Sequence, residues 1–224
     1  LVVLSILYIT NIKHFRSEND INDIPFSRAI KMPFIHKSFY FLRHGETDWN
    51  KQQRIMGQSD IPLNKNGVLQ AKTAAEKIQV LPIDAIVTSP LKRAYATAEI
   101  ISNKIRRPVF IDNDLREFGW GIMEGKVKGD CSYKDTPFEP EKWWKQGIVP
   151  TGAEAFSEFI SRVVKATNYH LPLYQNILFV AHGGIIMAIL AAIGKLPQRV
   201  DNTALFHFTP PALGEPSWGV NIIN

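Results

Sequence analysis

Short apolar runs alternate along this chain with longer segments in which apolar residues recur every three or four positions. The short runs predict β-strands, and the periodic segments predict helices that pack one face against a sheet. The expected strands begin at residue 39 and span 83–88, 108–111, 177–181, 204–208 and 219–223; the expected helices span 64–79, 91–103, 151–168 and 185–193. This alternation predicts an α/β fold, a three-layer α/β/α sandwich with a mostly parallel central sheet.

Two of the expected helices have clear start signals. Asn64 can cap the first helix through its side-chain oxygen. Ser89-Pro90 predicts the start of the second helix, with serine as the cap and proline in the first turn. The residues 48–63, which precede Asn64, are expected to form a loop.

One internal segment, 121–150, breaks the alternation. It contains glycines, prolines and the pair Trp143-Trp144. We expect it to be a small cap insertion. It would cover the edge of the sheet at which a ligand binds and determine which substrate is accepted.

The first 31 residues need a separate interpretation. The apolar run 1–12 is too short to span a membrane, and it lacks the basic start and small-residue cleavage site of a signal peptide. Met32 stands shortly before the first strand. We therefore expect residues 1–31 to be a disordered or non-native extension, and residues 32–224 to form one catalytic domain.

Composition narrows the choice of partner and compartment. A chain of 224 residues with 45% apolar residues can bury one good core. The net charge of +5 favours acidic partners, yet no Lys/Arg-rich run indicates nucleic acid, so a small anionic molecule is expected. Cys131 is the single cysteine, which excludes an internal disulfide and favours a reducing compartment, the cytoplasm. Either a monomer or a homodimer fits.

Two histidines follow predicted strands. His44 follows the first apolar run, His182 follows the run at 177–181, and each is followed by glycine. Ligands of open parallel sheets bind at the carboxyl ends of the strands, where both histidines are expected to lie. A neutral imidazole there can attack phosphorus directly.

Other charged residues could serve the same reaction. Arg43 precedes His44, and Arg93 lies near the start of a helix, so planar guanidinium groups could neutralise phosphoryl oxygens. Glu117 lies among aromatic residues, where desolvation favours the protonated carboxyl group, which could act as an acid.

Together these residues resemble the histidine phosphatase superfamily, the phosphoglycerate-mutase-like proteins, from about residue 38 to the end. The shared motifs are Arg43-His44-Gly45-Glu46-Thr47, Trp49-Asn50, Arg54, Gly57-Gln58, Pro62-Leu63, Thr88-Ser89-Pro90-Leu91, Arg93-Ala94, Glu117 and His182-Gly183. The resemblance implies that His44 is the phosphorylated nucleophile and Glu117 the proton donor. It also implies that Arg43, Arg93 and His182 hold the phosphoryl group.

The same resemblance implies a substrate pocket and no metal or cofactor, because cationic side chains supply the charge. The residues implied to line the pocket are Thr47, Asn50, Arg54, Gly57, Gln58 and Gly183. Gly184 stands where mutases of the family usually carry asparagine, and Ala155 where phosphatases often carry serine. The expected activity is therefore that of a histidine acid-type phosphatase acting on a small phosphorylated metabolite.

Alternatives stay open at this point. A cofactor-dependent phosphoglycerate mutase and a non-catalytic phospho-ligand binder share most of these motifs. A structural or metal-ligand role for His44 and His182 is disfavoured, because the remaining histidines show no metal-ligand spacing. A cysteine phosphatase is disfavoured because no arginine closely follows Cys131.

Overall fold

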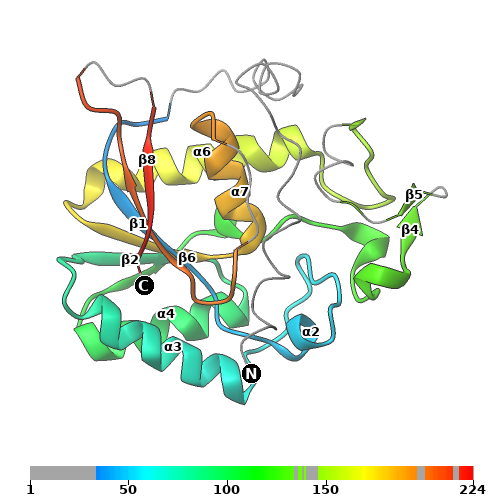
Figure 1. Ribbon diagram of the computed structural model, residues 1–224, viewed down its shortest axis with the longest axis horizontal. Coiled ribbons are helices and arrows are strands. Elements are labelled where there is room, and N and C mark those ends of the chain that lie inside the picture. Colours follow the sequence, from blue (N-terminus) through cyan, green and yellow to red (C-terminus); the bar gives the residue numbers. More distant parts are fainter. Residues whose placement is uncertain are drawn as a thin grey trace, which may run out of the picture.

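Six β-strands form one central sheet in the part of the chain that the computed structural model describes, residues 34–133, 136–137, 139, 146–195, 200–213 and 217–223 (Figure 1). Their order across the sheet is β3-β2-β6-β1-β7-β8. The bounds are β1 Phe39–Arg43, β2 Ala85–Thr88, β3 Val109–Ile111, β6 Ile177–Ala181, β7 Leu205–Thr209 and β8 Gly219–Ile223. Among these strands β7 alone runs in the direction opposite to the other five, so the predicted mostly parallel sheet is confirmed.

Helices cover both faces of the sheet. Figure 1 shows α3 (Lys65–Ile78) and α4 (Lys92–Ile105) on one face, and α6 (Phe156–His170) and α7 (Gly183–Ala192) on the other. The predicted three-layer α/β/α architecture is therefore confirmed.

The side chains of the central strand β1 alternate between the two layers. Phe39 and Phe41 belong to the core cluster that includes Phe159 of α6, whereas Leu42 belongs to the cluster that includes Ala98 of α4. Successive side chains of a strand point to opposite faces, so a strand covered on both sides must be apolar throughout. This requirement explains the unbroken apolar runs in the sequence.

Helix starts are where the structure departs from the sequence pattern. Asn64 caps α3 as expected, since its Oδ1 accepts a hydrogen bond from the Gly67 N–H at 2.8 Å. The expected cap at Ser89 is wrong, because α4 begins after Leu91. The Ser89 hydroxyl instead contacts the ring of His182 at 2.8 Å.

Other elements also differ from expectation. The expected loop at 48–63 contains the one-turn helix α2 (Asp48–Lys51), which Thr47 caps. The helix expected from residue 151 begins at Phe156, because Ala153 instead forms a β-bridge with Trp120. Helix α7 begins two residues earlier than expected, at Gly183.

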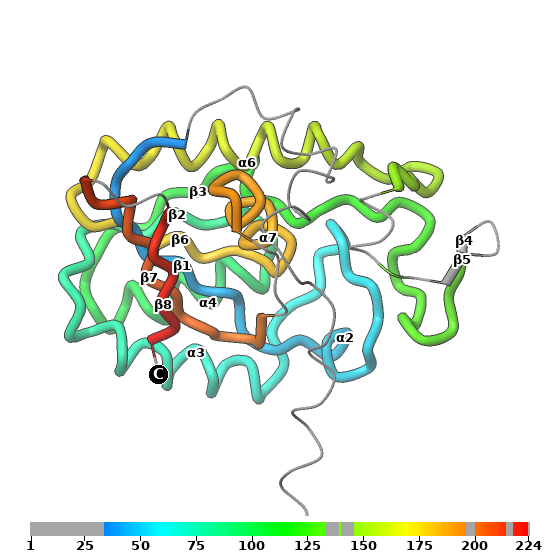
Figure 2. Tube along the Cα trace, turned by 45° about the horizontal axis from the view of Figure 1, so that its top comes forward, coloured from blue at the N-terminus to red at the C-terminus, as the bar shows by residue number. Residues whose placement is uncertain are grey.

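The expected cap, 121–150, is described in part. It begins with the 3-10 helices η2 (Gly121–Met123) and η3 (Lys128–Asp130) and continues into the paired strands β4 (Ser132–Tyr133) and β5 (Thr136–Pro137). Figures 1 and 2 both place this hairpin at the end of the molecule farthest from β8. The pair Trp143-Trp144 and the extension 1–31 lie outside the described residues, so both expectations stay predictions. Among the described residues, no helix combines the length and apolar character that crossing a bilayer requires.

Candidate active site

Three parallel strands bring their carboxyl ends together at one edge of the sheet. In the register of the sheet, Arg43 of β1 pairs with Ala181 of β6, and Thr88 of β2 pairs with Val180 of β6. The residues that follow, His44, Ser89 and His182, therefore meet at that edge. The rings of His44 and His182 lie 5.2 Å apart between centroids.

The backbone fixes the tautomer of His44. Its Nδ1 lies 2.7 Å from the carbonyl oxygen of Gly45, and a carbonyl can only accept, so Nδ1 carries the hydrogen. Burial lowers the pKa of His44 well below its usual value, and the charges of Arg93 and Arg43 lower it further. The ring is thus neutral, and Nε2 holds the lone pair that a nucleophile needs.

A hydroxyl group orients the other histidine, which has the same tautomer. The Ser89 Oγ accepts a hydrogen bond from the Leu91 N–H at 3.3 Å and lies 2.8 Å from Nε2 of His182. Burial is the main cause that lowers the pKa of His182 well below its usual value, and the charge of Arg93 adds to it. We therefore assign a neutral ring in which Nε2 accepts from Ser89 and Nδ1 carries the hydrogen. Among the described residues this buried Nδ1 has no partner, which leaves a donor for an anion.

A loop at residues 57–59 holds the buried guanidinium group of Arg93 through hydrogen bonds. It donates to the carbonyl oxygens of Ser59 at 2.8 Å and Gly57 at 2.7 Å, while its buried Nε has no partner among the described residues. Burial lowers the pKa of Arg93 to about 10, and the negative charge of Glu117 opposes that shift. Arg93 therefore stays cationic at neutral pH, and the N–H of its Nε is available to an anion.

A second guanidinium, that of Arg43, comes from the end of β1. It donates to the carbonyl oxygen of Val200. Its charge contributes to the lowered pKa of both His44 and His182. The predicted set of two arginines around two histidines is thus brought together in one place.

The carboxylate of Glu117 lies at the start of helix α7. Its Oε2 accepts from the backbone N–H of Gly184 at 3.1 Å, and its Oε1 accepts from the N–H of Phe118 at 2.8 Å. Since α7 follows His182 directly, the carboxylate is docked beside the second histidine, and its charge reaches Arg93. A carboxyl group, a neutral imidazole and two cations thus surround one position.

Two of the predicted pocket residues mainly hold each other. Thr47 and Asn50 form a capping box at α2, in which the Thr47 Oγ1 accepts from the Asn50 N–H and the Asn50 Oδ1 accepts from the Thr47 N–H, both at 3.1 Å. The amide of Asn202 donates to the carbonyl oxygen of His44 at 2.9 Å and to the Asn50 Oδ1 at 3.3 Å. Both residues therefore support the backbone of His44, and contact with a substrate stays a prediction.

The other predicted pocket residues divide between the loop and the helix start. Arg54 donates to the carbonyl oxygen of Gly125 at 2.7 Å and so joins the loop to the cap. Gly57 has a φ of 54°, and a Cβ there would lie 2.0 Å from Glu124 Oε1, so this turn needs glycine. Gln58 follows it, and Gly183 is the first residue of α7. Their roles in binding stay predictions.

The sequence analysis does not predict the roles that several residues have in the site. Ser89 orients His182, and Asn202 holds the backbone of His44. Glu124 accepts from the N–H groups of Gln58 and Ser59, both at 2.9 Å, and so fixes the loop that holds Arg93. For Ser89 a signal existed: it follows a third parallel strand, as the two histidines follow theirs.

Comparisons with known proteins agree with this geometry. A family model described as histidine phosphatase superfamily (branch 1) matches residues 39–209. An uncharacterized phosphatase, PhoE, from Bacillus subtilis is 37% identical over 167 residues, which cover 73% of this chain and 81% of the relative. A probable phosphoglycerate mutase, GpmB, from Cronobacter sakazakii is 37% identical over 172 residues, 72% of this chain and 77% of the relative.

Solved structures share the fold over most of the chain. A mycobacterial glucosyl-3-phosphoglycerate phosphatase, in complex with VO3, matches with a TM-score of 0.71 and 28% identity, covering 84% of this chain and 99% of the other. A putative alpha-ribazole-5'-P phosphatase from Escherichia coli matches with a TM-score of 0.69 and 26% identity, covering 85% and 97%.

Proposed function

The chain belongs to the histidine phosphatase superfamily, and on that premise we propose that it is a metal-independent phosphomonoesterase that works through a phosphohistidine. The observation that carries the proposal is the state of His44. Its Nδ1–H is bound to the Gly45 carbonyl, so the lone pair of Nε2 is available. Two arginines and the Nδ1–H of His182 surround it with positive charge and donors.

In the proposed first step, Nε2 of His44 attacks the phosphorus of a phosphomonoester. The N–P bond forms while the bond from phosphorus to the ester oxygen breaks. Arg43, Arg93 and His182 bind the equatorial oxygens, whose charge they neutralise throughout. The Glu117 carboxylate takes up a proton as the phosphoryl dianion enters beside it, and it gives this proton to the departing alkoxide, so an alcohol leaves.

In the second step, water attacks the phosphohistidine. The Glu117 carboxylate left by the first step takes a proton from that water, the N–P bond breaks, and inorganic phosphate forms. His44 regains its lone pair and Glu117 its proton, so every group returns to its initial state. The single group thus serves first as acid and then as base.

We further propose that the substrate is a small phosphorylated metabolite and that neither nucleic acid nor a membrane is a partner. The relatives support the reaction class: two of the solved structures are phosphatases or putative phosphatases of small phosphorylated molecules by their descriptions.

A phosphoglycerate mutase is the second candidate function, because some relatives are described as probable phosphoglycerate mutases. A mutase would return the phosphoryl group to a second substrate hydroxyl instead of passing it to water. It would require a bisphosphorylated cofactor and release no net phosphate.

The test measures phosphate release from a panel of phosphomonoesters in the presence of EDTA. Wild type should release phosphate, His44→Ala should release none, and His36→Ala, an exposed histidine that contacts Trp218, should match wild type. An acid-labile, alkali-stable phosphoenzyme that is absent in His44→Ala should accumulate during turnover. No release from any compound, with 3-phosphoglycerate converted only when 2,3-bisphosphoglycerate is present, would establish the mutase. Binding without either reaction would leave a phospho-ligand binder.

A further inference from the structure

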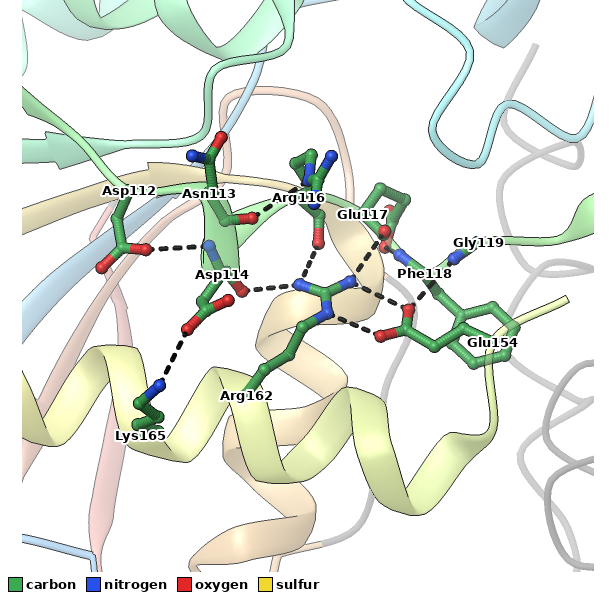
Figure 3. A network of polar contacts seen from close by, with 10 residues as sticks. All are labelled: Asp112, Asn113, Asp114, Arg116, Glu117, Phe118, Gly119, Glu154, Arg162 and Lys165. Carbon is green, nitrogen blue, oxygen red and sulfur yellow. Dashed lines mark hydrogen bonds and ion pairs between the residues drawn. The ribbon is translucent and has the colours of Figure 1, made fainter.

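Arg162, in the middle of helix α6, divides the donors of its guanidinium group between Glu154 and the segment that carries Glu117 (Figure 3). Its Nε and Nη2 donate to the two carboxylate oxygens of Glu154, at 2.6 and 2.9 Å. Its Nη1 donates to the carbonyl oxygens of Asp114 and Arg116, at 2.6 and 2.7 Å, and Nη2 also donates to the carbonyl oxygen of Glu117 at 3.0 Å. All five N–H donors of an arginine therefore have partners.

These bonds hold the acid segment on both sides of Glu117. Arg162 binds carbonyl oxygens before and at Glu117, and its partner Glu154 accepts from the N–H of Gly119 just after it, at 3.3 Å. The side chains of Arg162 and Glu154 are each only 17% exposed, so solvent screens the pair weakly. A short loop whose carbonyls point at one buried guanidinium has little freedom to move.

The same arginine also borders the place where the carboxylate rests. Its guanidinium carbon lies 4.8 Å from the centre of the Phe159 ring, one turn earlier on α6. A Cβ added at Gly184 would lie 3.3 Å from that ring, so the ring borders Gly184, whose N–H binds the Glu117 carboxylate. Helix α6 therefore supports both the backbone and the resting place of the acid.

We propose that Arg162, oriented by Glu154, is a positioning residue for the proton donor Glu117. The inference rests on the proposed function, since it assigns a partner to the acid of that reaction. Arg162 touches no reacting atom and acts only through Glu117. The role requires an arginine, because the flat fork reaches three carbonyls and a carboxylate at once, whereas a lysine has three donors on one nitrogen.

The experiment exploits the fact that an acid matters only when the leaving group needs a proton. The two substrates are 2-glycerol phosphate, which leaves as an alkoxide, and 2,4-dinitrophenyl phosphate, whose phenolate leaves unprotonated. In kcat/KM, which reports the steps up to departure of the leaving group and not the later hydrolysis of the phosphohistidine, Glu117→Gln should slow the first substrate by about 10²-fold and the second by only a few-fold. Arg162→Met and Arg162→Lys should reproduce this selective loss, and Glu154→Gln should do so more weakly.

The matched control is Lys165→Met, on the same face of α6. Lys165 pairs with the Asp114 carboxylate at 3.8 Å and is 73% exposed, and Figure 3 shows that it reaches the same segment without binding its carbonyls. It should retain both activities. Thermal unfolding of each variant identifies any that no longer folds, and Arg162→Lys retains the charge and most of the bulk if Arg162→Met fails.

A double variant separates positioning from an independent effect. Arg162→Lys added to Glu117→Gln should slow 2-glycerol phosphate by no more than about 3-fold beyond Glu117→Gln alone, because the acid is already lost. Equal losses on both substrates, additive losses in the double variant, or full activity of folded Arg162→Lys would each overturn the proposal. Failure of the wild type to hydrolyse either ester would instead overturn the proposed function, so the two failures are distinguishable.

Discussion

Replacing Gly184 with alanine should displace the acid while the fold stays intact. A Cβ at this position would lie 2.1 Å from Glu117 Oε1 and 3.3 Å from the ring of Phe159. The carboxylate is the free end of a flexible side chain, so it can swing aside, whereas the Cβ on helix α7 cannot. The substitution thus tests whether the observed position of Glu117 is the productive one.

The size of the effect follows from the distances. Ordinary van der Waals contact begins near 3.4 Å, so Oε1 must retreat by about 1 Å, a displacement that can cost roughly 10²-fold in rate. That factor equals about 2.7 kcal/mol in the activation free energy. For stability, alanine in a helix gains about 0.5–1 kcal/mol over glycine, and crowding against Phe159 offsets it. Activity should therefore fall while the free energy of unfolding changes by less than about 1 kcal/mol.

The assay measures kcat for 2-glycerol phosphate together with Tm. Gly129→Ala is the control, because a Cβ there meets no atom within 4 Å; it should leave both quantities unchanged. If Gly184→Ala folds and retains kcat within about 3-fold, the carboxylate position seen here is irrelevant to proton transfer, and the assignment of Glu117 as the acid is refuted. A large fall in Tm would instead show that the crowding at Phe159 has been underestimated.

Three more predictions follow from the polar contacts. Ser89→Ala removes the hydroxyl that orients His182, so kcat/KM should fall by about 10-fold or more, as steady-state kinetics can measure; unchanged kinetics would contradict the tautomer assignment. Because burial lowers the pKa of His44, the nucleophile stays neutral as the pH falls through 6.5, so kcat/KM should not decline there; an acid limb near pH 6.5 would refute this. The hydrogen bond from His170 lowers the pKa of Asp112, so its stabilisation is present above about pH 4 and is lost as the pH falls further. In urea titrations, the stability difference between wild type and His170→Phe should shrink below pH 4.

The sheet could be predicted because its strands are buried on both faces. Such strands must be apolar at every position, and the runs at 177–181 and 219–223 gave the bounds of β6 and β8 to the residue. The cap of α3 was equally local, since Asn64 binds an N–H three residues away. Both features depend on residues that are close together in the chain, so the sequence alone predicts them.

Contacts between distant segments could not be predicted in the same way. Arg162 binds carbonyl oxygens 45 to 48 residues earlier, and a backbone carbonyl has no signature in the sequence. Ser89 looked like a helix cap because serine before proline usually is one, but its hydroxyl binds a histidine 93 residues later. In both cases the chemistry of the partner, not the local pattern, decides the role of the side chain.

The Glu124 side chain joins the start of the cap to the loop beside the candidate active site. The Glu124 carboxylate accepts from the Trp120 N–H at 3.1 Å on the cap side, and from the Ser59 N–H and hydroxyl at 2.9 and 2.6 Å on the loop side. That loop supplies the carbonyl oxygens that hold Arg93. A change that moved Glu124 would therefore shift Ser59, and Ser59 in turn would shift Arg93, which binds its carbonyl oxygen. Lys126 and Lys128 also bond to Ile55 and Gln53 of the same segment, so the predicted role of the cap in substrate specificity would fall to the residues that follow Lys128.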